Sequence, residues 1–171
     1  MKKNITILLF IFFSFSSVFA DTPHYLDFKL ILNESNAGKE TQTFLKKKLE
    51  NGFNNINDKE KKILEEEKKL IQQKKILSAD EYKNKVSELR KKVSALQKEK
   101  NDIIQSVNKQ KNKARNVLLK SLNPIVKNYM QEKKIRIVID KKSILLADEN
   151  LDITKDIMNQ LNKELKSIKL N

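Results

Sequence analysis

The fold is decided by residues 78–117, which read SADEYKNKVSELRKKVSALQKEKNDIIQSVNKQKNKARNV. Apolar residues recur here at alternating steps of three and four, and the pattern is missed only at Lys100 and Gln110. The apolar positions are Tyr82, Val86, Leu89, Val93, Leu96, Ile103, Val107, Ala114 and Val117. A repeat of this kind keeps one face of an α-helix turned toward a partner helix. The stretch therefore predicts one arm of a coiled coil.

The beginning of this helix has a clear start signal. Ser78 can accept a hydrogen bond from the Glu81 amide while the Glu81 side chain reaches back, which is the capping-box pattern. Asp80 and Glu81 also place negative charge in the first turn, where the helix dipole favours it. We expect a tip near residues 77–81 and a new helix beyond it.

A second repeat lies before the tip, in residues 37–77, which contain no proline. The residues spaced seven apart are Leu49, Ile56, Ile63, Leu70 and Leu77. The complementary position is charged at Glu60, Glu67 and Lys74, so we expect a thin apolar seam and an arm that bends and opens locally. Two long helices joined by a short tip must run antiparallel, and about 40 residues at about 1.5 Å each give an arm of about 60 Å.

The segments on either side of the helical arm favour β-structure. Residues 25–32 (YLDFKLIL) predict a short strand that runs into a turn or helix start, and residues 135–140 and 143–147 predict a hairpin of strands. Pro124 should kink the second arm helix or open a fresh segment, because proline removes one backbone hydrogen bond.

A short amphipathic helix is expected at the C-terminus, with Asp152 or Thr154 as its N-cap. Its apolar face comprises Ile153, Ile157, Leu161, Leu165 and Ile168.

The first 20 residues have the layout of a secretory signal peptide. Lys2 and Lys3 precede an apolar run over residues 5–13, and small residues lead to an expected cleavage after Ala20. An uncleaved membrane anchor is the alternative, but the run is shorter than the roughly 20 apolar residues that span a bilayer. The chain has no Cys, so neither a lipoprotein anchor nor a disulfide is possible.

The predicted chain is mostly α with a small β part. Residues 1–20 form the signal peptide, residues 37–132 form the antiparallel helical hairpin, and residues 21–36 with 133–171 form a β-rich body that includes the C-terminal helix. A sheet of two or three strands with one short helix is marginal as an independent core. We therefore expect other subunits to complete the body.

The chain is strongly basic. It has 36 basic and 22 acidic residues, and removal of the signal peptide with its two lysines leaves a net charge of +12. This charge favours nucleic acid, anionic lipid head groups or acidic polypeptides as partners, and export argues against nucleic acid. A genome rich in Lys, Asn and Ile codons is the alternative explanation of the charge.

Catalysis is not expected. The single histidine, His24, precedes the predicted strand and is interpreted as a solvated linker residue, and no Cys is available as a nucleophile or metal ligand. Gly38 and Lys39 lack the glycine-rich sequence of a phosphate loop, so Gly38 is expected to let the chain enter the helix closely packed. We expect no catalytic residue, cofactor or metal.

The candidate binding feature is the stretch 103–131, which contains six basic residues and no acidic one. The six are Lys109, Lys111, Lys113, Arg115, Lys120 and Lys127. They would hold acidic polypeptides by many weak contacts that salt screens. A solvated helix face without a ligand is the alternative.

The order of these elements resembles the Skp/OmpH family of periplasmic chaperones. The likeness is in Leu26-Asp27-Phe28 followed by residues 32–39 (LNESNAGK), and in Ile137-Val138-Ile139-Asp140 followed by Asp152-Ile153-Thr154. With the tip and the heptads, the resemblance covers nearly the whole chain after residue 20.

The resemblance implies a homotrimer in which a β-body joins three helical hairpins around a cavity. It also implies ATP-independent holding of unfolded outer-membrane β-barrel proteins in the periplasm, with anionic lipid or lipopolysaccharide surfaces as further partners. The residues expected in the trimer body are Leu26, Phe28, Ile135, Ile137, Ile139 and Leu145. The rival interpretations are a periplasmic coiled-coil scaffold without chaperone activity and a histone-like binder of nucleic acid, which the signal peptide contradicts.

Overall fold

The computed structural model describes residues 22–170, so the predicted signal peptide lies outside the described residues. The main elements are β1 (His24–Leu26), α1 (Phe28–Glu34), α2 (Asn36–Gln73), α3 (Ala79–Glu132), β2 (Val138–Asp140) and α4 (Thr154–Glu164). None of the helices in residues 22–170 is both long and apolar enough to cross a membrane.

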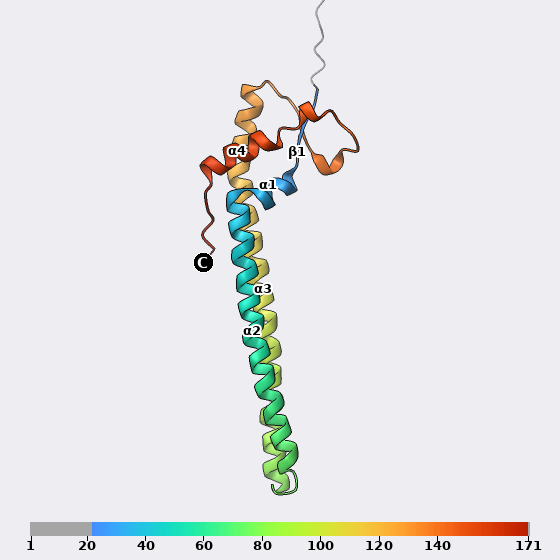
Figure 1. Cartoon of the computed structure of the whole chain (residues 1–171), viewed down its shortest axis with the longest axis vertical. Helices are drawn as coiled ribbons and strands as arrows, with labels where there is room; N and C mark the ends of the chain where they lie inside the picture. Colours follow the sequence, from blue (N-terminus) through green and yellow to red (C-terminus); the bar gives the residue numbers. More distant parts are fainter. Residues whose placement is uncertain (1–21, 171) are drawn as a thin grey trace, which may run out of the picture.

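Helices α2 and α3 lie side by side and antiparallel, and they form a long arm that projects from a small body at one end (Figure 1). The predicted mostly α fold with a long hairpin and a small β part is confirmed. Buried apolar residues such as Ile56, which is 1 % exposed, pack between the two arm helices. Ion pairs also connect the two helices. Lys59 Nζ lies 2.6 Å from Glu99 Oε1, and Lys92 Nζ donates to Glu66 Oε2 over 2.6 Å.

The tip has the expected capping box. Ser78 Oγ accepts from the Glu81 amide at 3.3 Å, and Glu81 Oε2 accepts from the Ser78 amide at 3.0 Å. The Ser78 hydroxyl also donates to this carboxylate, which lowers the pKa of Glu81. Helix α2 ends at Gln73, so Leu77 lies in the turn. Its place in the seven-residue repeat had predicted that it lies on the helix.

Helix α3 continues through Pro124 to Glu132, so no fresh segment opens there. Pro124 lies on the exposed side of the helix, whereas Leu122 and Ile125 are each 2 % exposed in the core of the body. Their packing holds both sides of the proline in one helix, at the cost of one backbone hydrogen bond.

The sheet of the body joins the segments that precede and follow the helical hairpin. Strand β1 pairs with β2 in parallel, with His24 opposite Val138 and Leu26 opposite Asp140. His24 is therefore part of a strand, and its amide donates to the Ile137 carbonyl at 3.0 Å. Its interpretation as a solvated linker residue is wrong, because the distant β2 segment supplies a partner.

The predicted hairpin of strands over 135–140 and 143–147 is also wrong. Only Val138–Asp140 is a strand, and Lys141–Ser143 forms a 3₁₀ turn that Asp140 caps by accepting from the Lys142 amide at 3.2 Å. The turn directs the chain away from β2 before a second strand can pair with it. The prediction for residues 25–32, a short strand that runs into a helix start, is confirmed, because β1 ends at Leu26 and Asp27 caps α1 by accepting from the Leu30 amide at 2.7 Å.

The core of the body forms where α1, α3 and α4 meet, and Figure 1 shows α4 lying across α3 near the root of the arm. Asp152 accepts from the Thr154 amide at 2.9 Å at the start of α4, although the residue directly before the helix is Ile153. The core residues are Leu26, Ile31, Ala37, Leu118, Leu122, Ile125, Tyr129, Ile135, Ile153, Ile157 and Leu161.

One partly buried hydrogen bond connects α4 to α3. The Tyr129 hydroxyl donates to Asp156 Oδ2 at 2.6 Å, and Tyr129 is 8 % exposed. An ionised Tyr129 could no longer donate this hydrogen bond, and its negative charge would lie next to the Asp156 carboxylate. The pKa of Tyr129 therefore rises to about 12.

Candidate functional site

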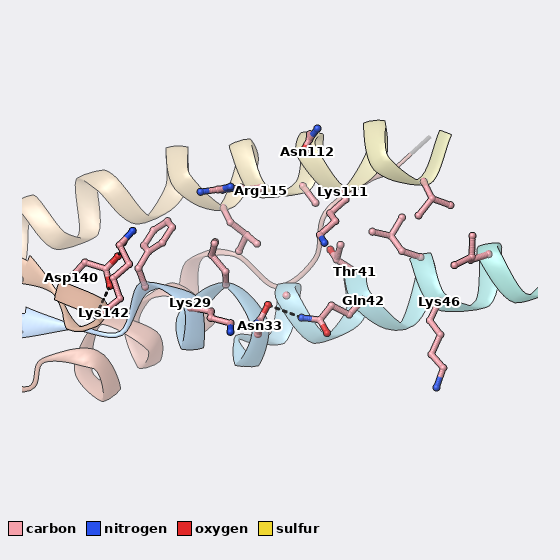
Figure 2. Close-up of a pocket in the computed structure, with 18 residues that line it drawn as sticks. Lys29, Asn33, Thr41, Gln42, Lys46, Lys111, Asn112, Arg115, Asp140 and Lys142 are labelled. Carbon is pink, nitrogen blue, oxygen red and sulfur yellow. Dashed lines mark hydrogen bonds and ion pairs between the residues drawn. The ribbon is translucent and has the colours of Figure 1, made fainter. Parts of the chain in front are cut away.

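The candidate site is a groove at the root of the arm, where α1 lies against α2 and α3 (Figure 2). Its volume is about 730 Å³. We call it the arm-root groove. Its apolar lining comprises Phe28, Leu32, Leu45, Leu49, Val107, Ala114 and Leu118. Its basic lining comprises Lys29, Lys46, Lys111, Arg115 and Lys142.

A sharp turn between α1 and α2 makes one end of the groove. Ser35 ends α1 and caps α2, and its hydroxyl accepts from the Gly38 amide at 3.2 Å. A Cβ atom on Gly38 would overlap the Leu32 carbonyl oxygen and lie 2.9 Å from Ser35 Oγ. The expectation that Gly38 allows close packing at the helix entrance is confirmed.

The groove is positively charged. Its single acidic residue, Asp140, pairs with Lys142 at 3.3 Å. Lys29, Lys46, Lys111 and Arg115 form no ion pair with any residue between 22 and 170. An anionic group in the groove would therefore meet cations that have no competing partner within the described chain.

Thr41 adds an unsatisfied polar group to the wall of the groove. The residue is 8 % exposed, and its Oγ1 atom is buried without a hydrogen-bond partner among the described residues. Thr41 on α2 and Lys111 on α3 point toward one another across the groove (Figure 2). A buried hydroxyl without a partner is unfavourable, and it marks this wall as unusual.

The structure does not bring the six predicted cations to one surface. Lys111 and Arg115 line the arm-root groove. At about 100° per residue, the other four lie on the opposite side of α3 from the buried Ala114 and Leu118. These four are Lys109, Lys113, Lys120 and Lys127, all exposed. Lys127 also lines a shallower hollow beside β2.

Several polar residues of the groove were not predicted from the sequence, among them Lys29, Lys46, Lys142 and Thr41. Lys29 and Lys46 lie far from residues 103–131 in the sequence, Lys142 lies beyond the end of that stretch, and no local pattern links the three. The i,i+4 spacing does not signal the split of the six cations, because Lys109 and Lys113 have the same spacing as Lys111 and Arg115 and adjoin the same positions of the repeat.

The residues predicted for the trimer body fall into two groups. Leu26 and Ile135 are buried in the core of the single chain, and Phe28 packs partly against it. Ile137, Ile139 and Leu145 are exposed, by 53 %, 36 % and 103 %, and the neighbouring Leu146 is 92 % exposed. Part of the predicted interface is thus already used within the chain, and the remaining residues are exposed.

No group of His, Asp and Glu side chains in residues 22–170 is arranged to hold a metal ion. Ionisable groups of opposite sign meet mainly in exposed pairs, such as Lys141 with Asp152 at 3.0 Å. Such pairs stabilise a surface weakly. The arm-root groove offers charged and apolar contacts to a ligand.

Comparison with known proteins agrees with this fold. The chain is similar to the crystal structure of a candidate outer membrane chaperone, OmpH-like, from Caulobacter crescentus, with a TM-score of 0.80. The two chains are 20 % identical, and the match covers 88 % of this chain and 90 % of the other. No curated protein matches the sequence. The model of the OmpH-like outer membrane protein family matches residues 24–161, and the chain belongs to this family.

Proposed function

We propose that the chain is a periplasmic chaperone that holds unfolded outer-membrane β-barrel proteins, without ATP and without catalysis, in a cavity between helical arms. The observation that supports this most is the long arm of an OmpH-like fold with unpaired cations at its root. Cations without fixed partners make weak, exchangeable contacts with an acidic polypeptide, which suits holding and release.

The proposal includes a homotrimer. The two-stranded sheet is small for an independent body, and the single chain leaves four apolar residues of the body exposed, namely Ile137, Ile139, Leu145 and Leu146. Further subunits would cover these residues and set several arms around one cavity. The mass of the exported protein by light scattering tests this, and a stable monomer would contradict both the trimer and the cavity.

Export is proposed on the basis of the first 20 residues, with their two lysines, apolar run and small residues before Ala20. The N-terminal sequence of the protein recovered from the periplasm should begin at Asp21. The net charge of +12 that remains after removal of the signal peptide also supports attraction to anionic lipid or lipopolysaccharide surfaces as further partners.

The holding activity is tested by diluting a denatured outer-membrane β-barrel protein into buffer and following its aggregation by light scattering. The chain should suppress aggregation without ATP, and added salt should weaken the suppression because it screens the cations. If aggregation proceeds as in the absence of the chain, the chain is a coiled-coil scaffold and not a chaperone.

A further inference from the structure

We propose that the arm-root groove is a binding site for a short polypeptide segment in which apolar side chains alternate with carboxylates. The inference rests on the proposed function, because an unfolded client protein would supply such a segment. It differs from general charge attraction along α3, since it assigns the contact to one groove and to two of the six cations of residues 103–131.

The apolar lining of the groove explains why the bound segment would contain apolar side chains. Phe28 and Leu32 from α1 line the groove with Leu45 from α2, and Phe28 and Leu32 pack against the buried core that contains Leu118. A volume of about 730 Å³ is within the range of pockets that enclose small ligands, so a few apolar side chains can enter together. Their transfer from water would stabilise the complex.

The cations of the groove explain why the bound segment would also contain carboxylates. Lys111 and Arg115 lie one turn apart on α3, and neither forms an ion pair with a residue that the structure describes. A carboxylate placed between them would gain charge-assisted hydrogen bonds without breaking an existing pair. Lys142 is less available, because Asp140 pairs with it at 3.3 Å.

Amide side chains in the wall favour a polypeptide over a lipid. Asn33 and Gln42 line the groove, and the Gln42 amide donates to Asn33 Oδ1 at 2.9 Å, which leaves each side chain with further donors or acceptors. Such groups match the N–H and C=O groups of a peptide backbone, whereas an acyl chain has no polar atoms for them. The unpartnered Thr41 hydroxyl adds to this polar wall.

The test compares two double variants of the full-length mature chain. K111Q/R115Q removes the two groove cations, and K109Q/K113Q removes two exposed cations at the same spacing on the opposite side of α3. The probe is a fluorescent peptide of alternating Leu and Glu, and its binding is followed by anisotropy. Control peptides replace Glu by Gln or Leu by Ser, and vesicles of phosphatidylglycerol test a lipid ligand. Circular dichroism verifies that both variants keep their helices.

The Leu–Glu peptide should bind the unaltered chain and bind K111Q/R115Q about tenfold more weakly, as expected for two partly screened ion pairs. K109Q/K113Q and the unaltered chain should bind it equally, and both control peptides should bind more weakly. An equal loss in both variants would mean general charge attraction and overturn the proposal. Vesicle binding that is lost in K111Q/R115Q while peptide binding persists would overturn it in favour of lipid.

The peptide measurement is separate from the aggregation assay. If the unaltered chain fails to suppress aggregation, the proposed chaperone function fails. If it suppresses aggregation but the Leu–Glu peptide binds K111Q/R115Q unchanged, the groove proposal alone is wrong.

Discussion

Thr41 has a polar side-chain group in a place that offers it no hydrogen-bond partner among the described residues. Its hydroxyl is buried in the wall of the groove. Leaving a buried hydroxyl unpaired costs about 1–3 kcal/mol. Natural chains keep such residues mainly where function requires them.

Replacing Thr41 by Val should therefore stabilise the free chain. Valine has the same shape without the hydroxyl, so the gain in the free energy of unfolding should be about 1 kcal/mol. Thr43→Val on the exposed side of the same helix is the matched control and should change little. Thermal unfolding followed by circular dichroism measures both, and a lower melting temperature for Thr41→Val would contradict this interpretation of its hydroxyl.

Tyr129 is the polar residue that most clearly stabilises the body. Removing its hydroxyl in Tyr129→Phe leaves the Asp156 carboxylate without its 2.6 Å partner and should cost about 1.5–3 kcal/mol of unfolding free energy. Tyr82→Phe is the control, because Tyr82 makes no hydrogen bond through its hydroxyl within residues 22–170.

The same bond makes stability depend on alkaline pH. The folded state holds the Tyr129 proton up to a pKa of about 12, whereas the unfolded chain releases it near 10. The stabilisation is therefore complete below pH 10 and declines as the pH rises from about 10 to about 12. The unaltered chain should lose more stability over this interval than Tyr129→Phe. Equal pH profiles would show that the hydrogen bond is absent in solution.

At the scale of elements, the helices could be predicted from the sequence and the sheet could not. The heptads and the Ser78 capping box are local patterns, and the structure contains both helices and the cap. Strand β1 precedes the two arm helices in the sequence and β2 follows them, so no local pattern predicts that the two strands pair. The apolar run at 143–147 resembled a strand, but the turn at Lys141–Ser143 leaves it without a partner in the sheet.

The turn from α1 into α2 is the element that shapes the arm-root groove, and Gly38→Ala tests it. The added methyl would overlap the Leu32 carbonyl, which is backbone and cannot turn aside, so the loss should be about 1–3 kcal/mol.

Gly52→Ala is the matched control for this change in the same helix. Its Cβ would lie 2.9 Å from Ile103 Cγ2, in a side chain that can shift, and alanine gains about 1 kcal/mol of helix propensity. Urea unfolding should show a large loss for Gly38→Ala alone. Equal stability of the two variants would contradict the tight entrance to α2.

At the scale of the whole molecule, the site was only partly predictable because it combines distant segments. Lys111 and Arg115 could be found as part of a basic stretch, but Lys29 and Lys142 join them only because the sheet brings the segments before and after the helical hairpin together at the root of the arm. Charge along a sequence predicts that anions are attracted. It does not predict where several cations share a cavity.

The exposed apolar residues of the body give a prediction about assembly. Leu145 and Leu146 are almost fully exposed in the single chain, so L145E/L146E should leave each subunit folded. In a trimer that covers these residues, the same change would bury two charges and cause dissociation. Leu64→Glu, at an exposed apolar position on the arm, should leave the mass unchanged. Light scattering measures all three proteins, and an unchanged mass for L145E/L146E would remove these two residues from the interface.

The parallel pairing of β1 with β2 also determines the order in which a newly made chain can acquire its structure. The ribosome delivers His24–Leu26 early, yet the partner strand Val138–Asp140 follows only after the whole hairpin has been made. Local helices can form during this interval, whereas closing so long a loop is slow. A chain interrupted before Val138 would contain both arm helices but no completed base, and β1 would be left as an unpaired, aggregation-prone end. Until its last quarter is synthesised, the chain would itself need the protection from aggregation that we propose it gives to others.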